Sequence, residues 1–450
     1  MRVFEPKILT SFKGYKAKNV VSDIIAGIIV AIIALPLSIA LAIASGATPE
    51  RGLYTAIVAG LVISLLGGSK VNISGPTAAF ATIVAGIIAT NGMDGLVIAT
   101  IMAGIILILL GICRVGTLIR FIPSSITVGF TGGIAVTLII GQLKDFMGLT
   151  YPDGVSAIET IDKIKLVFEN ISSINPWALL VGGIALLILI VWPLISKKIP
   201  GSLIAVLVGA LVALIPVIDV NTIGSLYTIT PTLPTISLPT LDLSKIVALI
   251  PNAFTIALLA GIESLLSCVV SDGIINDKHN SNTELIAQGV GNIFVGFFGG
   301  IPATGAIART AANVRNGGRS PISGITHSLV LLLVMVILLP YAQAIPMPVI
   351  AAILFVVAYN MSEWRHFVKI IKTKVWSDIL VLMLTFVLTV VFDLVKAIAV
   401  GIVVHYAIVA IRYGINKYKT KKVAEENDKK QTDENSLEKN DKLEESEKGE

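Results

Sequence analysis

Two ionisable side chains interrupt long apolar stretches of this chain, and both could bind charge. Glu263 lies within one such stretch, and Arg309 follows the glycine- and proline-containing residues 299–308. A carboxylate in apolar surroundings is suited to bind a proton or a sodium ion, and Ser267 lies one helical turn further on the same face. Two structural alternatives stay open, because Glu263 could serve only helix packing, or it could form an ion pair with Arg309.

A second irregular segment, residues 73–80, resembles the segment before Arg309 in character. Proline suits the first turn of a helix, so Pro76 predicts a helix start that leaves the amides of Thr77, Ala78 and Ala79 free to bind an anion. Near Arg309, the positive end of a helix dipole would add about half a unit charge to the guanidinium. Two such helix starts that face one another would form an electropositive pocket.

The composition places these residues in a membrane protein. Of 450 residues, 55% are apolar and only 14% are charged, and the mean hydropathy is +0.88; a soluble domain carries about 25% charged residues. We count about 14 apolar stretches that could span a bilayer. The formal net charge of +5 is explained by basic loops on one side of the membrane, so no nucleic-acid partner is expected. Cysteine and histidine spacing predicts no metal site and no cofactor.

The order of these stretches predicts two halves with one irregular segment in each. Irregular backbone is tolerated at membrane depth only where it is buried or lines a cavity, and such paired segments indicate the binding site of a transporter. We therefore expect half-helices at spans three and ten of an all-α polytopic protein in the cell membrane, with both termini cytoplasmic. The predicted units are a basic cytosolic leader (1–22), seven spans (23–227), an extended connector (228–245), seven spans (246–413) and a disordered charged tail (414–450).

Several motifs recur together in one known family. They are Pro36, SGATPERGLY at 45–54, ISGPTA at 73–78, ESLL at 263–266 and GIPATGAIART at 300–310. Together they resemble the sulfate permease (SulP) family of anion transporters, over about residues 20–412. The resemblance implies two inverted repeats of seven spans, divided into a core and a gate domain, with an anion site between the N-termini of spans three and ten. By position, that site falls on Thr77, Ala78, Ala79, Glu263, Gly305, Ala306 and Arg309.

The chain departs from the family pattern at three places. Residues 414–450 are too few and too polar for the C-terminal STAS domain of many members, so we expect that domain to be missing. Leu37 stands where many eukaryotic members have a glutamine. Ile307 stands where sodium-coupled bicarbonate members tend to have a hydroxyl, although they resemble this chain around Glu263 and Ser267. Glu263 and Ser267 are therefore expected to bind a coupling proton, with sodium as the alternative.

These observations favour a transporter over an enzyme. We expect cation-coupled, elevator-like alternating access that carries a small anion such as sulfate, bicarbonate or a dicarboxylate, in a homodimer embedded in the lipid bilayer. The alternatives are an uncoupled anion channel and a nucleobase permease of the same fold. Arg309 favours an anion over a nucleobase, and a channel would keep conducting after loss of the Glu263 carboxylate.

Overall fold

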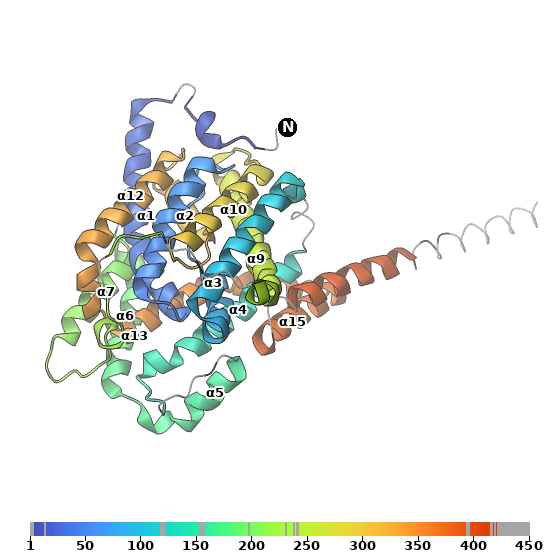
Figure 1. Ribbon diagram of the computed structural model, residues 1–450. Helices are drawn as coiled ribbons and strands as arrows, with labels where there is room; N and C mark the ends of the chain where they lie inside the picture. The colour runs from blue at the N-terminus through green and yellow to red at the C-terminus, as the bar shows by residue number, and fades with distance from the viewer. Residues whose placement is uncertain are drawn as a thin grey trace, which may run out of the picture.

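The computed structural model describes residues 4–12, 15–117, 123–152, 157, 159–196, 199–229, 232–236, 239, 243–392, 397–414, 417 and 420. Regular structure in these residues is almost entirely α-helical (Figure 1). Nine of the described helices are long and apolar enough to cross a membrane, and two shorter apolar helices, Gly201–Ala213 and Trp376–Val391, accompany them. The all-α polytopic fold is therefore confirmed, while the number of fourteen spans stays a prediction.

The order of elements in the first half recurs in the second half. The first half comprises η1 (Lys7–Leu9), α1 (Ala17–Ala44), α2 (Pro49–Leu66), β1 (Ser74–Gly75), η2 (Ala78–Phe80), α3 (Ala81–Ile112), η3 (Val115–Thr117), α4 (Ser124–Met147), α5 (Thr160–Glu169), η5 (Ile171–Ser173), α6 (Pro176–Ile195), α7 (Gly201–Ala213) and α8 (Ile223–Leu226). The second half comprises α9 (Leu243–Ile275), α10 (Ser281–Phe297), β2 (Thr304–Gly305), α11 (Ile307–Arg315), α12 (Ile322–Leu338), η6 (Leu339–Ala344), α13 (Met347–Met361), α14 (Trp364–Lys372), α15 (Trp376–Val391) and the helix Ala397–Gly414. Each half thus opens with two helices, then a two-residue strand, then a helix that begins just after the strand.

The two strands join the halves of the chain. β1 pairs with β2 in antiparallel register, with Ser74 opposite Gly305 and Gly75 opposite Thr304. An inverted repeat requires this arrangement, because a two-fold axis in the membrane plane reverses the direction of equivalent segments. The two irregular segments that the sequence singles out therefore lie side by side.

The helices pack in two groups, which correspond to the expected core and gate domains. One group contains α1, α2, α3, α9, α10, α11 and α12, and the other contains α4, α6, α7, α13 and α15. The N-terminal end of α1 and helix α5 lie at opposite ends of the molecule (Figure 1). The strand pair belongs to the first group, since β1 contacts α2 and β2 contacts α9.

Helix α3 joins the predicted spans three and four through a sharp bend. At the bend, Gly92 has φ 69° and ψ −173°, a conformation that a residue with a side chain rarely adopts. The sequence predicts a break between residues 90 and 96, and the bend at Gly92 falls inside it.

Helix α1 begins at Ala17, within the predicted leader, and it continues through Asp23 without interruption. Asp23 is fully buried. Its carboxylate accepts hydrogen bonds from the amides of Arg319 and Ser320, at 2.6 and 3.1 Å, and from the hydroxyls of Ser320 and Tyr15. Burial and the hydrogen bond to Asp23 raise the pKa of Tyr15 to about 12. The hydrogen bonds of Asp23 thus tie the start of α1 to the segment that leads into α12.

Two predicted segments fall partly outside the described residues. In the predicted connector 228–245, the described residues before α9 are not helical; they are 228–229, 232–236 and 239. Residues 230–231, 237–238 and 240–242 lie outside the described residues. Helix α9 begins at Leu243, within the predicted connector. Of the tail 414–450, only residues 414, 417 and 420 are described. Helix α4 extends to Met147, and α5 lies in the polar stretch that follows it.

Helices α3 and α10 pack closely because glycines meet at their crossing. A Cβ atom on Gly104 would lie 2.5 Å from the carbonyl oxygen of Gly289, and a Cβ on Gly289 would lie 2.5 Å from that of Gly104. Small residues allow such close backbone approach between helices in membranes. We expect Gly289→Ala to force the helices apart and to cost about 1–3 kcal/mol of stability, measured as thermal unfolding of the purified protein. Gly183→Ala is the control, since a Cβ on Gly183 meets no atom within 4 Å.

Candidate functional site

The strand pair brings two helix starts together. After β1 the chain enters η2 and α3, and after β2 it enters α11. The amide of Ala306 donates to the carbonyl of Ile73 at 2.8 Å, which extends the pairing by one hydrogen bond. Because the strands are antiparallel, the two helices begin on opposite sides of the same pair.

The amides at these helix starts differ in their availability. Thr77 caps η2 without a hydrogen bond from its own side chain to the helix, and it is partly exposed, whereas Ala78 and Ala79 are buried. On the other side, the predicted contact residue Ala306 already has an acceptor for its amide. The first turn of α11 begins after it, with Ile307 partly exposed and Ala308 exposed. Amides in a first turn have no acceptor within the helix, so the accessible donors here follow Ala306.

Glu263 lies on α9 beside the first of these helix starts. Its side chain is partly exposed, and it accepts a hydrogen bond from the hydroxyl of Thr77 at 2.8 Å. It forms no ion pair with Arg309 in this structure, since none of the ion pairs among the described residues joins the two. The structural ion pair that the sequence left open is therefore not formed here.

Arg309 lies in the first turn of α11 and is only 2% exposed. One terminal nitrogen donates to the carbonyl of Pro76, which links α11 to the start of η2. Its Nε and Nη1 atoms are buried and have no hydrogen-bond partner. Gly75 makes room for the guanidinium, because a Cβ there would lie 2.5 Å from Nη1. A buried charged donor without an acceptor is costly, so these two nitrogen atoms leave a local excess of hydrogen-bond donors at the start of α11.

Ser267 and Gly305 are buried, and both lie against Asn72. Ser267 is fully buried, and its hydroxyl lies 2.8 Å from Asn72 Oδ1 and 3.0 Å from Thr310 Oγ1, rather than against Glu263. A Cβ on Gly305 would lie 2.6 Å from the side-chain amide of Asn72. Asn72 thus connects both residues to a buried polar network behind the strand pair.

The centre of this network is Glu284, which sequence reasoning missed. Glu284 is fully buried in α10. Its carboxylate accepts hydrogen bonds from five donors at 2.7–3.2 Å: the amides of Gly68 and Ser69 and the side chains of Asn72, Ser264 and Gln288. The signal in the sequence is a stripe of polar residues at helical spacing in an apolar segment, Glu284, Gln288 and Asn292.

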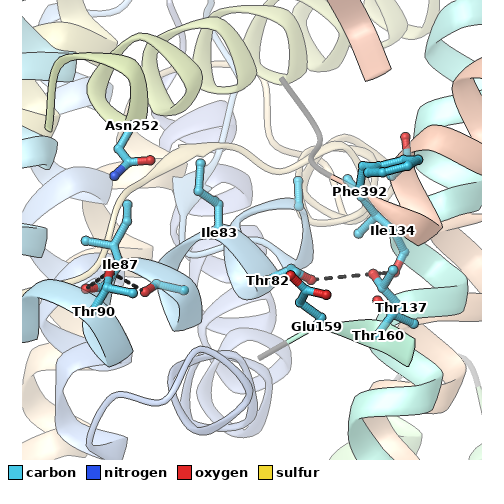
Figure 2. A pocket seen from close by; sticks show the side chains of 13 residues that line it. Thr82, Ile83, Ile87, Thr90, Ile134, Thr137, Glu159, Thr160, Asn252 and Phe392 are labelled. Atoms are coloured by element: carbon cyan, nitrogen blue, oxygen red, sulfur yellow. Dashed lines mark hydrogen bonds between the residues drawn. The ribbon is translucent and has the colours of Figure 1, made fainter. Parts of the chain in front are cut away.

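A cavity of about 300 Å³ lies between the two helix groups (Figure 2). Ala79 is the one predicted site residue that lines it, and Thr82 of α3 lies opposite Thr137 of α4 with 3.4 Å between their hydroxyl oxygens. The cavity reaches Glu159 and Thr160 at the start of α5. The cavity therefore extends from the start of the α3 segment toward the end of the molecule that α5 covers.

Two helical repeats that share an antiparallel strand pair, with a helix beginning on each side of it, define a membrane transporter built from inverted repeats. Residues 20–385 match the Sulfate permease family, and the chain belongs to that family. It is accordingly a transporter and not an enzyme.

Individual relatives agree with this assignment. A Bacillus subtilis protein with the name "Putative sulfate transporter YvdB" is 44% identical over 398 residues, which cover 88% of this chain and 74% of the relative. The bicarbonate transporter BicA of Picosynechococcus sp. is 32% identical over 403 residues, which cover 86% of this chain and 69% of the relative.

Solved structures agree as well. The transmembrane domain of a cyanobacterium bicarbonate transporter BicA has a TM-score of 0.77 at 30% identity, covering 85% of this chain and 98% of that chain. The murine anion transporter Slc26a9 in the inward-facing state has a TM-score of 0.82 at 20% identity, covering 90% of this chain and 71% of that chain, and shows the shared fold.

Proposed function

We propose that the protein is a secondary active transporter of a small anion, with sulfate, bicarbonate and dicarboxylates as the candidate substrates. The anion binds between the starts of η2 and α11, where Thr77, Ala78, Ala79, Gly305, Ala306 and Arg309 surround it. The observation that carries this proposal is Arg309, a buried guanidinium with two nitrogens that lack an acceptor, placed beside two helix starts. Each of these features attracts negative charge. The relatives named for sulfate and bicarbonate support the same class of substrate.

The proposed coupling ion binds at Glu263. Thr77 joins the two sites, because its hydroxyl donates to Glu263 while its amide lies at the start of η2. Ile307, which lies at the start of the opposite helix, brings no oxygen ligand, and Ser267 is bonded to Asn72 and Thr310. Sodium binds through oxygen ligands, so the environment favours a proton, and sodium is the alternative.

The proposed movement is a displacement of the core group against the gate group. The group with the strand pair packs internally through α3, α9 and α10, and it touches the other group mainly through α1 and α3. The cavity of Figure 2 lies at this boundary, so a sliding movement would close it on one side and open access on the other. We also propose a homodimer in the cell membrane, with both termini cytoplasmic.

Uptake by the purified protein in liposomes tests the proposed function. Labelled sulfate, bicarbonate or a dicarboxylate should accumulate when a proton or sodium gradient is imposed. Absence of uptake for all three anions under both gradients would refute the proposal. Stabilisation against thermal unfolding identifies the substrate independently, because a ligand that binds the folded state raises its stability with occupancy.

The Arg309→Ala variant is expected to bind the anion about 10–100-fold more weakly, the equivalent of losing a hydrogen bond to a charged group. The dissociation constant is measured through thermal stabilisation by the anion. The exposed Arg412 provides the matched control, since Arg412→Ala removes the same charge far from the strand pair in sequence. Equal affinities for both variants would show that Arg309 does not contact the anion.

A further inference from the structure

A second cavity, of about 380 Å³, lies apart from the strand pair, where α4, α14, α15 and the helix Ala397–Gly414 meet. Its polar lining comes from all four helices: Ser124, Ser125, His366, Lys369, Asp378 and His405. None of these residues belongs to the proposed transport site. No group of metal-binding side chains occurs among the described residues, so the cavity calls for another ligand.

The charge around this cavity favours an anion. Helix α4 begins at Ser124, and Pro123 before it supplies no side-chain cap, so the first amides of a 24-residue helix border the cavity. Four exposed cations lie on α14 or just after it: Arg365, Lys369, Lys372 and Lys374. Two carboxylates oppose them, Asp378 in the lining and Glu363 beside His366. The cations are therefore in excess even before either histidine is protonated.

Helix α14 has the character of a helix at a membrane surface. Its apolar residues Phe367 and Ile370 pack against Val128 of α4 and Leu382 of α15, while its basic residues are exposed. A tryptophan stands at each end of the segment, Trp364 with 45% and Trp376 with 81% of its surface exposed. Exposed tryptophans and a basic amphipathic helix mark the level of the lipid headgroups. The cavity thus opens where lipid phosphates lie.

Apolar surface next to the cavity suits lipid chains. Ile371 follows the lining residue Ile370 and is 40% exposed, and Leu380 lies two residues after the lining residue Asp378 and is 53% exposed. A soluble phosphate would use only the polar lining, whereas a phospholipid would use both surfaces. We propose that this cavity binds the headgroup phosphate of an anionic glycerophospholipid, with Lys369 and the first amides of α4 as its main partners. The acyl chains lie along α14 and α15.

The experiment compares full-length protein in bilayer nanodiscs of phosphatidylcholine with and without phosphatidylglycerol. Phosphatidylglycerol should raise the thermal stability of the protein and stay bound in native mass spectrometry. Lys369→Ala should weaken this binding about fivefold, the usual effect of one basic residue at a lipid surface. Lys372→Ala is the matched control, because it removes the same charge from the same helix outside the cavity. It should weaken binding less than about twofold.

Three results would overturn the proposal. Equal losses for Lys369→Ala and Lys372→Ala would show diffuse attraction rather than a site. Displacement of phosphatidylglycerol by inorganic phosphate at equal concentration would assign the cavity to a soluble anion. Lack of any preference for phosphatidylglycerol over phosphatidylcholine in the unmodified protein would exclude an anionic headgroup. All three readouts are independent of transport, and unfolding temperatures in phosphatidylcholine alone verify that both variants are folded.

Discussion

The Glu263→Gln variant is expected to bind the anion and yet to lose uptake driven by a cation gradient. Glutamine keeps the size of the side chain and an oxygen that can accept the hydrogen bond from Thr77, which is 2.8 Å long in the native protein. It loses the charge and the ability to take up a proton. The gradient-driven rate should fall by a factor of about 30 or more, which corresponds to losing ~2 kcal/mol of a charge-assisted interaction.

Two measurements make this prediction decisive. Uptake of the labelled anion is followed in liposomes with a proton gradient alone and with a sodium gradient alone, while anion binding is followed by thermal stabilisation. Thr77→Val separates the hydrogen bond from the charge, because it removes the hydroxyl but leaves the carboxylate of Glu263 able to bind a cation. Undiminished gradient-driven uptake by Glu263→Gln would exclude Glu263 as the coupling group. Anion flux that ignores both gradients in the native protein would instead indicate a channel.

The irregular backbone of the two segments could be predicted from the sequence, because its cause is local. Glycine and proline in residues 73–80 and 299–310 interrupt apolar stretches where a continuous helix would otherwise form. The pairing of Ser74 with Gly305 then places the interruptions together. The bend at Gly92 has a comparable local cause, because glycine alone adopts its φ of 69° without strain.

The partners of individual side chains could not be predicted, because they depend on contacts between distant parts of the chain. Ser267 shares a helical face with Glu263 by spacing, but it bonds to Asn72 and Thr310. Asp23 lies at the start of the first predicted span, and its partners, the amides of Arg319 and Ser320, lie almost 300 residues away in the sequence. Sequence spacing fixes the face on which a residue lies, and only the packing of helices decides what that face meets.

One feature of Arg309 could be predicted from the sequence, and another could not. Its position near a helix start follows from the preceding glycine and proline residues, and the structure places it in the first turn of α11. Arg309 donates to the carbonyl of Pro76 and not to Glu263, because the irregular segment 73–80 passes beside α11. The proposal of an anion site rests on this second fact, since Nε and Nη1 are thereby left without acceptors.

The Glu284→Ala variant is expected to lose about 3–5 kcal/mol of stability, the usual cost of removing one partner from a buried charged network. The carboxylate accepts hydrogen bonds from five donors in the loop after α2, in α9 and in α10, and all five donor residues are buried. Alanine would leave those donors without an acceptor in a dry interior. The loss is measured as a lower unfolding temperature and a lower yield of folded protein.

The comparison with other carboxylates explains why we assign Glu284 to structure and propose Glu263 as the coupling group. Glu169→Ala, in an exposed pair with Lys165 at 3.8 Å, should change stability by less than about 0.5 kcal/mol. Glu284→Gln should be destabilised as well, since its amide group would face the donors of Gly68 and Ser69 or those of Asn72 and Gln288. Native stability of Glu284→Ala with weakened anion binding would instead assign Glu284 to the substrate.

Both carboxylate oxygens of Glu284 already accept hydrogen bonds, so neither is left for a coupling ion. Glu263 accepts one hydrogen bond, from Thr77, and is partly exposed.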